Sequence, residues 1–465
     1  MKIGVISLGC AKNLVDSEVM LGHLGKAGCS FVQDPAEADV ILVNTCSFIE
    51  AAREESVETI LEAARLKKTG NLKRLVVAGC MVQRYPSELR ESLPEVDAFI
   101  GLDQLDQVVA GAGLPPSDAA AVPATPASGL LTVSAAEPPG SDLPLLQPST
   151  YLYDENTPRD LATPKWTAYI KIAEGCDHTC AFCAIPAFRG KFRSREPRSI
   201  VAEATALAAR GVREISLIAQ DSSHYGRDLD LREGLATLLT DLNGVEQLRW
   251  IRQHYLYPNT ITPRLIETMA RLPRVVDYVD LPLQHAHPEM LKRMRRGGSG
   301  ASHLELLGRF RAAMPDGALR STFIVGFPGE TDEEFEALLE FVREARLDHL
   351  GVFTYSHEEH TSALAMKDDV PAELKTERQG RVMELQRELA EERNLTRVGR
   401  TVEVLVEGAH PETEHLLVGR TAGQALDVDG QVLINDGHAE PGSFVQVEMT
   451  DVAGYDLVGR IVGAA

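Results

Sequence analysis

The chain has 465 residues, of which 44% are hydrophobic and 25% charged, and its formal net charge is −21 at pH 7. This composition is ordinary for a globular protein, and the length predicts roughly two to four domains. No apolar run reaches the roughly 18 residues of a membrane helix, and residues 1–10 do not resemble a signal peptide. We therefore expect a cytoplasmic protein without a membrane partner. The negative charge argues against a general nucleic-acid binder and suits a basic partner, although acidity also serves solubility.

Residues 1–110 alternate between strand-like and helix-like patterns. The expected strands are Lys2–Leu8, Asp39–Asn44 and Arg74–Ala78, and the expected helices are Leu14–Ala27 and Ile49–Lys68. Such alternation is typical of an α/β domain with a parallel sheet.

A segment of low apolar content follows this domain. Residues 111–148 are dominated by Pro, Ala, Ser and Gly, as in Leu114-Pro115-Pro116-Ser117. Such a composition cannot form a core, so we predict a flexible linker over residues 111–160.

Residues 161–398 repeat the strand–helix alternation six times. The expected strands are Ala168–Ala173, Glu214–Ala219, Leu248–Tyr255, Tyr278–Leu283, Ser321–Val325 and Leu350–Tyr355. The expected helices are Ser199–Arg210, Glu233–Leu242, Thr262–Ala270, Pro288–Arg296, His303–Ala313 and Thr331–Ala345, with a long charged helix, Ala372–Asn394, after the last strand. Six consecutive βα units predict a partial (βα)6 barrel, related to the complete eightfold TIM barrel.

The tail, residues 399–465, has a different pattern. Val402, Val404 and Val406 alternate with polar residues, and Asp429-Gly430 is a turn signal between such runs. This pattern predicts a small antiparallel β-barrel.

Cys176, Cys180 and Cys183 form a C-x3-C-x2-C motif just after the first expected barrel strand. Three thiolates on one loop can hold three irons of a four-iron cluster and leave the fourth iron open. A zinc site with His178 as the fourth ligand is the alternative. Structural zinc sites usually take their ligands from two separated pairs, so the spacing favours the cluster.

Three more cysteines, Cys10, Cys46 and Cys80, each end an expected strand of the first domain. The carboxyl ends of parallel strands lie side by side, so these thiols are expected to converge at a second site. The alternative is that each is a small buried residue, as free cysteines often are. Cys29 ends no such strand and is expected to be structural. The odd total of seven cysteines argues against a disulfide framework.

The C-x3-C-x2-C loop after the first strand of a βα barrel resembles the radical S-adenosylmethionine (SAM) superfamily. The resemblance implies that the open iron binds SAM and that an electron from the cluster cleaves it to a 5′-deoxyadenosyl radical. Gln220, at the end of the second strand, matches a position that contacts the methionine moiety. The segment Thr322–Pro328, which contains Gly326, resembles the motif on the adenine side. Without the cysteines, Gly326 and Pro328 would be interpreted as a simple turn.

Two three-cysteine sites and a terminal barrel together resemble the methylthiotransferases, which have an N-terminal cluster domain, a radical SAM barrel and a TRAM barrel. The resemblance implies two [4Fe–4S] clusters, SAM, and an electron donor such as flavodoxin or ferredoxin. It also implies hydrogen abstraction from an unactivated carbon, sulfur from the N-terminal cluster and a methyl group from a second SAM. The chain itself would place the reactants, so no catalytic residue beyond the cluster ligands is expected.

Members of this family modify either a tRNA base or an aspartate of ribosomal small-subunit protein twelve. Residues 7–18, 220–226 and 322–331 resemble the type that modifies the ribosomal protein. The tRNA type typically has Gly-Gln-Asn where this chain has Ala219-Gln220-Asp221. Methylthiolation of a tRNA adenosine remains the alternative within the family. An iron–sulfur electron-transfer or cluster-carrier protein is the alternative from another class.

The charge of the tail bears on this choice. Residues 401–465 contain eleven acidic and two basic residues, a balance of −9. A barrel that grips RNA needs Lys and Arg against phosphates, so direct RNA binding is not expected. An acidic TRAM domain would attract a basic ribosomal protein, although it can also be a solvated surface.

Two further features are less specific. The basic stretch Arg189–Arg195 can pair with a substrate carboxylate, but surface charge or support of the cluster loop is the preferred interpretation. His224 and Tyr225 follow the second strand, where loops commonly line the pocket.

Overall fold

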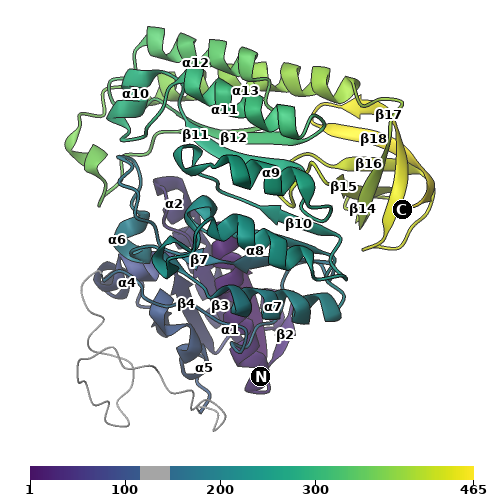
Figure 1. The fold of residues 1–465 in the computed structure, drawn as a ribbon. Coiled ribbons are helices and arrows are strands. Elements are labelled where there is room, and N and C mark those ends of the chain that lie inside the picture. Colours follow the sequence, from purple (N-terminus) through teal and green to yellow (C-terminus); the bar gives the residue numbers. More distant parts are fainter. Residues whose placement is uncertain (116–146) are drawn as a thin grey trace. The chain divides into compact units, whose positions relative to one another are not determined.

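The computed structural model describes residues 1–115 and 147–465, apart from the side chain of Glu414 (Figure 1). Residues 116–146, most of the predicted linker, lie outside the described residues. The chain divides into two compact units. The first comprises Met1–Ala162 and Ile185–Lys191, and the second comprises Thr163–Ala184 and Phe192–Ala465.

The first unit contains a five-stranded, wholly parallel sheet in the order β2-β1-β3-β4-β5. Its strands are β1 (Lys2–Ser7), β2 (Ser30–Val32), β3 (Val40–Thr45), β4 (Arg74–Gly79) and β5 (Ala98–Ile100). The three expected strands are confirmed as β1, β3 and β4. The edge strands β2 and β5 have three residues each, which is too short for a periodic pattern to reveal.

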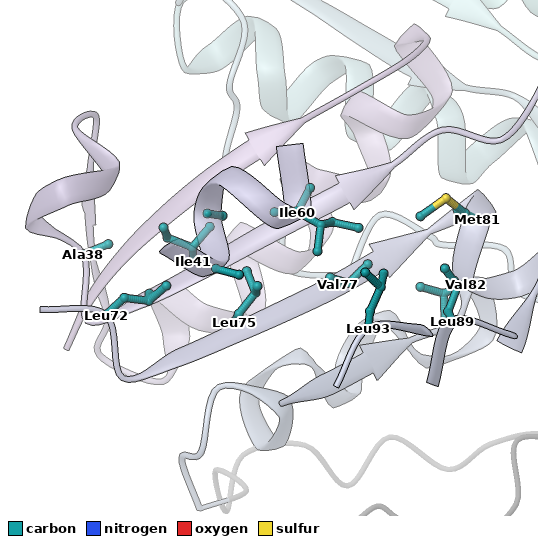
Figure 2. Packing of buried hydrophobic residues seen from close by; sticks show 13 residues of the cluster. Ala38, Ile41, Ile60, Leu72, Leu75, Val77, Met81, Val82, Leu89 and Leu93 are labelled. Carbon is teal, nitrogen blue, oxygen red and sulfur yellow. The ribbon is translucent and has the colours of Figure 1, made fainter. Parts of the chain in front are cut away.

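Helices cover this sheet, and the two long ones match the expected helices. They are α1 (Ala11–Lys26), α2 (Glu50–Thr69), α3 (Cys80–Arg84), α4 (Pro86–Ser92), α5 (Val108–Gly111) and α6 (Ile185–Arg189), with 3-10 turns η1 (Pro35–Glu37) and η2 (Leu102–Gln107). Figure 2 shows one side of the core, where Ile60 of α2 packs against Ile41 of β3 and Val77 of β4. Ile60, Ala63 and Ala64 are buried at helical spacing, which explains why α2 lies on the sheet.

The end of the predicted linker is ordered, which differs from the expectation. Glu18 of α1 is fully buried and accepts hydrogen bonds from Arg159 Nε at 2.9 Å and from Ala162 N at 2.8 Å. Gly22 of α1 lets this segment approach closely, because a Cβ there would lie 2.4 Å from the backbone nitrogen of Arg159. A buried carboxylate that needs partners holds this segment. Composition alone does not reveal such a contact.

The second unit begins with six strands that run parallel in chain order. They are β6 (Thr167–Lys171), β9 (Glu214–Ile218), β10 (Trp250–Gln253), β11 (Tyr278–Gln284), β12 (Ala318–Val325) and β13 (His349–Thr354). They form two three-stranded sheets, joined by an isolated parallel bridge between Ile251 and Val275. The expected six-stranded partial barrel is confirmed.

The helices of this unit also match the expected ones. They are α7 (Pro197–Ala209), α8 (Gly234–Asn243), α9 (Pro263–Arg271), α10 (Pro288–Arg293), α11 (Gly300–Ala313), α12 (Asp332–Ala345) and α13 (Ala372–Leu395). Shorter elements are β7 (Ala173–Glu174), β8 (Arg193–Ser194), η3 (Ser222–His224), η4 (Arg227–Leu229), η5 (Pro258–Thr260) and η6 (Ser362–Ala365). Among the described residues, no helix is both long and apolar enough to cross a membrane.

The tail is a closed five-stranded barrel in the order β14-β15-β16-β18-β17. Its strands are β14 (Thr401–His410), β15 (Thr413–Thr421), β16 (Val432–Asp436), β17 (Phe444–Ala453) and β18 (Asp456–Ala464). Four of its pairings are antiparallel, as expected, and β16 pairs with β18 in parallel.

The tail barrel packs against the amino ends of the parallel strands. Trp250 and Tyr278, at the starts of β10 and β11, share an apolar cluster with Leu405 of β14. Beside this cluster, Arg420 of β15 pairs with the buried Glu214 of β9 at 2.5 Å. The carboxyl ends of the parallel strands, where ligands bind in such folds, point away from this contact.

Candidate iron–sulfur and SAM sites

The three N-terminal cysteines come together at the carboxyl edge of the first sheet. Cys10 follows β1, Cys46 follows β3, and Cys80 follows β4 as the first residue of α3. A Cβ built on Gly9 would lie 2.8 Å from Cys46 Cβ and 3.0 Å from Cys46 Sγ, so the loops after β1 and β3 are in close contact. The sheet therefore places three thiols at one edge.

Glycine precedes two of these cysteines for a steric reason. Gly79 has φ +100°, and a Cβ there would lie 2.1 Å from Asn44 Oδ1 and 2.8 Å from the carbonyl oxygen of Thr45. Gly9 has φ +89°. These positions combine a left-handed backbone with a lack of space, which glycine alone tolerates.

Two buried asparagines, which no sequence motif marks as part of the site, tie the strand ends together. Asn13 Nδ2 of α1 donates to the carbonyl oxygens of Thr45 at 2.8 Å and Leu8 at 3.1 Å. Asn44 Nδ2 donates to the carbonyl oxygen of Asn13 at 2.7 Å and to Ser17 Oγ at 2.8 Å. The sequence feature that could have indicated this role is Asn44 itself, a polar residue that follows an apolar run within β3.

The electrostatics of the three thiols differ. Burial raises the pKa of Cys80 to about 12, although Arg189 opposes this effect. Burial also raises the pKa of Cys46. Desolvation raises the pKa of Cys10, but the charges of Lys12 and Arg189, together with backbone hydrogen bonds from Asn13 and Lys12, outweigh this effect and lower the pKa. The thiolate is the metal-binding form, so a bound cluster would supply the charge that Cys46 and Cys80 lack.

The C-x3-C-x2-C motif forms a loop between β7 and α6. Cys176, Cys180 and Cys183 are all partly exposed on it, and the amide of Cys183 donates to the carbonyl oxygen of Cys180 at 3.2 Å. Burial raises the pKa of Cys176 to about 12. Three thiols on one short loop are a donor set that suits three irons of a four-iron cluster.

His178, inside this loop, is held by other residues. Its Nε2 lies 2.7 Å from Asp221 Oδ2, and its ring stacks on Tyr257 with centroids 3.8 Å apart. Arg296 covers the Tyr257 ring and places Nη1 3.6 Å from Cys180 Sγ. A single zinc ion needs its ligands around one point. In the described parts of the chain, no three His, Cys, Asp or Glu side chains are grouped closely enough to hold a metal ion, the two cysteine triads included, so this finding does not separate zinc from a cluster. The ring of His178 is already held by Asp221 and Tyr257 and is not presented as a fourth ligand beside the cysteines.

Gln220 lies beside the start of the cysteine loop. Its Nε2 donates to Glu174 Oε1 at 2.5 Å, and Glu174 Oε2 pairs with Lys171 at 2.8 Å. Gln220 Oε1 is buried and has no hydrogen-bond partner among the described residues. A buried acceptor without a partner is unfavourable unless a ligand supplies a donor.

Gly326 lies in a turn after β12 that is held by a hydrogen bond to Glu330. Its φ is +73°, its amide donates to Glu330 Oε2 at 2.7 Å, and a Cβ there would lie 2.2 Å from Lys375 Cγ of α13. Glu330 is itself buried and pairs with Arg378 at 2.5 Å. The turn alone accounts for this glycine, and contact with SAM stays a prediction.

The less specific candidates have structural roles. Tyr225 is buried and donates from its hydroxyl to the carbonyl oxygen of Arg195 at 2.8 Å, while His224 packs edge-on against Phe192. Arg195 pairs with Glu203 at 2.6 Å. Arg189 and Arg195 are each only 2% exposed, so surface charge is the wrong interpretation for both. Arg189 belongs to the N-terminal site. The sequence does not reveal this, because Arg189 lies far along the chain from Cys80.

Comparisons with known proteins agree with this architecture. Residues 2–101 match the family described as "Uncharacterized protein family UPF0004", residues 170–342 match the radical SAM superfamily, and residues 398–462 match the TRAM domain. Among solved structures, the radical SAM methyltransferase TsrM from Kitasatospora setae is similar in fold, with a TM-score of 0.51 and 18% identity. The match covers 78% of this chain and 73% of that chain. Fold and sites thus define a radical SAM enzyme with a TRAM barrel.

Relatives that match over nearly the full length of the chain identify the family within this class. The chain is 46% identical to the ribosomal protein uS12 methylthiotransferase RimO of Koribacter versatilis, over 99% of this chain and 96% of the relative. It is 47% identical to RimO of Solibacter usitatus (99% and 95% covered) and 49% identical to RimO of Anaeromyxobacter sp. strain K (98% and 92%). The chain belongs to the RimO family of radical SAM methylthiotransferases. Enzymes of this family use SAM and [4Fe–4S] clusters.

Proposed function

We propose that this enzyme methylthiolates an aspartate of ribosomal protein uS12, converting a C–H bond to C–SCH3. The observation that carries the proposal is the presence of two separate three-cysteine sites, one at three strand ends and one on a single loop. The substrate is supported by relatives that are named uS12 methylthiotransferases over nearly their whole length. A ribosomal-protein substrate would place the reaction in the cytoplasm.

Each of the two cysteine triads would hold one cluster. Cys10, Cys46 and Cys80 would hold the auxiliary cluster, and Cys176, Cys180 and Cys183 would hold the cluster that binds SAM. Bound in these sites, the clusters and SAM supply radical chemistry and the sulfur and methyl groups. An electron carrier such as flavodoxin or ferredoxin would supply the reducing electron. The proposed domains are residues 1–110, 161–398 and 399–465, joined by residues 111–160.

Around the SAM site, the residues of this chain orient groups rather than react. The His178–Asp221 pair and the stacked Tyr257 hold the cysteine loop in one conformation. Glu174 fixes the amide nitrogen of Gln220, which leaves Gln220 Oε1 as a buried acceptor. The amino group of SAM is a donor of the kind that this oxygen needs. Gly326 would approach the adenine side.

The surface of the TRAM barrel supports a basic protein partner. The three arginines of residues 399–465 are all paired: Arg420 with Glu214 and Glu407 in the interior, Arg460 with Glu448 at 2.8 Å, and Arg400 with Asp316 at 3.1 Å. Arg420 is buried and cannot reach a phosphate, and the exposed Arg400 and Arg460 are each balanced by an adjacent carboxylate. The exposed acidic residues include Glu412, Asp436, Glu440 and Asp451. Because the barrel contacts the amino ends of the parallel strands, it would dock uS12 and take no part in the chemistry.

An anaerobic assay tests the proposal. Reconstituted enzyme, SAM, sulfide and reductant are offered uS12 and unmodified tRNA in parallel, and products are analysed by mass spectrometry. We expect one CH2S unit on an aspartate of uS12. Cys176→Ala should abolish both this product and SAM cleavage, whereas Cys80→Ala should abolish the product and retain SAM cleavage. Cys29→Ser, outside both triads, is the matched control and should remain active.

Other outcomes would contradict the proposal. Modification of tRNA alone would show that the acidic barrel does not select the ribosomal protein. Absence of SAM cleavage by the reduced, iron-loaded protein would favour an electron-transfer or cluster-carrier protein.

A further inference from the structure

Arg189 is part of the N-terminal unit, although it follows Cys183 of the central motif by only six residues. It is the last residue of the short helix α6, and it is 2% exposed. The chain therefore uses the segment directly after one cysteine triad to bring a buried cation to the other triad. Arg189 is not one of the proposed cluster ligands.

The guanidinium contacts a cysteine sulfur directly. Arg189 Nη2 lies 3.0 Å from Cys80 Sγ, 2.8 Å from Asn13 Oδ1 and 3.1 Å from Asp16 Oδ2. Asn13 also ties the loops after β1 and β3, so the arginine joins the network that holds the strand ends. The buried guanidinium is paired with Asp16 and also lies against the Cys80 sulfur, so its charge is held directly at a ligand of the proposed auxiliary site.

Electrostatics give the contact a functional consequence. Reduction adds one negative charge to a cluster, and a cation or an N–H donor at a ligating sulfur stabilises that charge. Hydrogen bonds to the sulfurs and local charge are among the factors that set cluster potentials. We infer that Arg189 is a positioning residue of the auxiliary cluster, which orients Cys80 and raises the reduction potential of the cluster. This inference rests on the proposed function.

Asp16 leads to a second prediction, in which the reduction potential of the cluster shifts in the opposite direction. Its carboxylate is 3% exposed and pairs with Arg189, so it offsets part of the arginine charge. Removal of Arg189 should make the cluster harder to reduce, and neutralisation of Asp16 should make it easier to reduce. A purely structural role of this pair predicts loss of stability in both variants but no opposite shifts.

The test uses the full chain with Cys176, Cys180 and Cys183 all replaced by Ala, so that only the auxiliary cluster is present. Iron and sulfide are counted, and the midpoint potential is measured by redox titration followed by electron paramagnetic resonance. Arg189→Met should lower the ratio of reduced to oxidised cluster about tenfold at a given potential, a shift of about 59 mV for one electron. Arg189→Lys should retain most of the potential, and Asp16→Asn should raise it.

The control and the possible outcomes separate the inference from the proposed function. Arg296→Met changes an arginine of the other triad and should leave this potential unchanged. A background variant that binds no iron would overturn the proposed auxiliary site itself. A loaded cluster with equal potentials in all Arg189 and Asp16 variants would overturn the inference alone. If Arg189→Met does not fold by circular dichroism, Arg189→Lys and Asp16→Asn decide the outcome, because equal potentials in these two would overturn it.

Discussion

His303 is a buried histidine, and neither of its ring nitrogens has a hydrogen-bond partner among the described residues. Its ring packs edge-on against Phe341 and lies next to Gly298, where a Cβ would be 2.8 Å from Nε2. Burial lowers the pKa of His303 to about 4, and Arg296 contributes in the same direction. The neutral imidazole is therefore the form that the fold accepts.

This site predicts a specific loss of stability in acid. Between pH 6.5 and about 4, the unfolded chain binds a proton at this position that the folded chain does not bind. The contribution of His303 is therefore present above pH 6.5 and falls with pH by up to about 1.4 kcal/mol per pH unit. Urea unfolding from pH 4.5 to 7.5 should show a shallower pH dependence for His303→Gln. His438→Gln, at an exposed position, should keep the wild-type slope, and an unchanged slope in both would contradict this account.

The lack of space around Gly79 predicts that a larger residue at this position reduces the amount of bound iron. Gly79→Ala should displace Asn44 and the turn into Cys80, since its Cβ would clash with Asn44 Oδ1. We expect about half of the iron to be lost after reconstitution, because the central triad remains intact. Gly28→Ala is the control. Gly28 also has a positive φ, +82°, but among the described residues no atom outside its immediate chain neighbours lies within 4 Å of the new Cβ, so the iron content of this variant should equal that of the wild type.

At the scale of elements, buried charges join the TRAM barrel to the parallel strands. Glu214 of β9 is fully buried between Arg420 of β15 and Arg252 of β10. Burial raises the pKa of Glu214, but the two arginines outweigh burial and lower it to about 2. Its stabilising effect is therefore complete above a pH of about 4.5 and is lost as the pH falls toward 2.

Loss of one partner should be costly here. Arg420→Met leaves Glu214 and Glu407 without their shared cation, and we expect a loss of about 3–5 kcal/mol in the free energy of unfolding. Hydrogen exchange should localise the effect to β14 and β15. Arg460→Met removes an exposed pair with Glu448 and should cost less than about 1 kcal/mol. Equal losses in the two variants would show that the buried ion pair stabilises the protein no more than the exposed one.

At the scale of the whole molecule, the net charge of −21 is predicted to act through the TRAM barrel. Replacement of Glu412, Asp436 and Glu440 by Lys should slow association with uS12 about tenfold at low ionic strength and reduce its salt dependence. Stopped-flow or surface-binding kinetics measure this rate. A matched triple variant with Glu54, Glu55 and Glu58 of α2 changed to Lys has the same net charge and exposed positions. Equal slowing by both variants would show that total charge, and not the barrel, governs the encounter.

The secondary-structure elements and the class of enzyme were predictable from the sequence. Apolar periodicity is local, so the strands β1, β3 and β4, the six barrel strands and their helices were predictable from short windows. Since Cys10, Cys46 and Cys80 each follow one of these strands, topology alone predicted that they converge. The cluster and SAM ligands themselves stay predictions.

The contacts between segments distant in the sequence were not predictable and follow from the fold. The edge strands β2 and β5, the parallel pairing of β16 with β18, and the packing of residues 149–162 on α1 have no periodic signal. Arg189 lies 109 residues from Cys80, and nothing in its own neighbourhood indicates that it meets that sulfur. Local sequence sets which face of an element is apolar, whereas the partner of a buried charge is set by the packing that removes it from water.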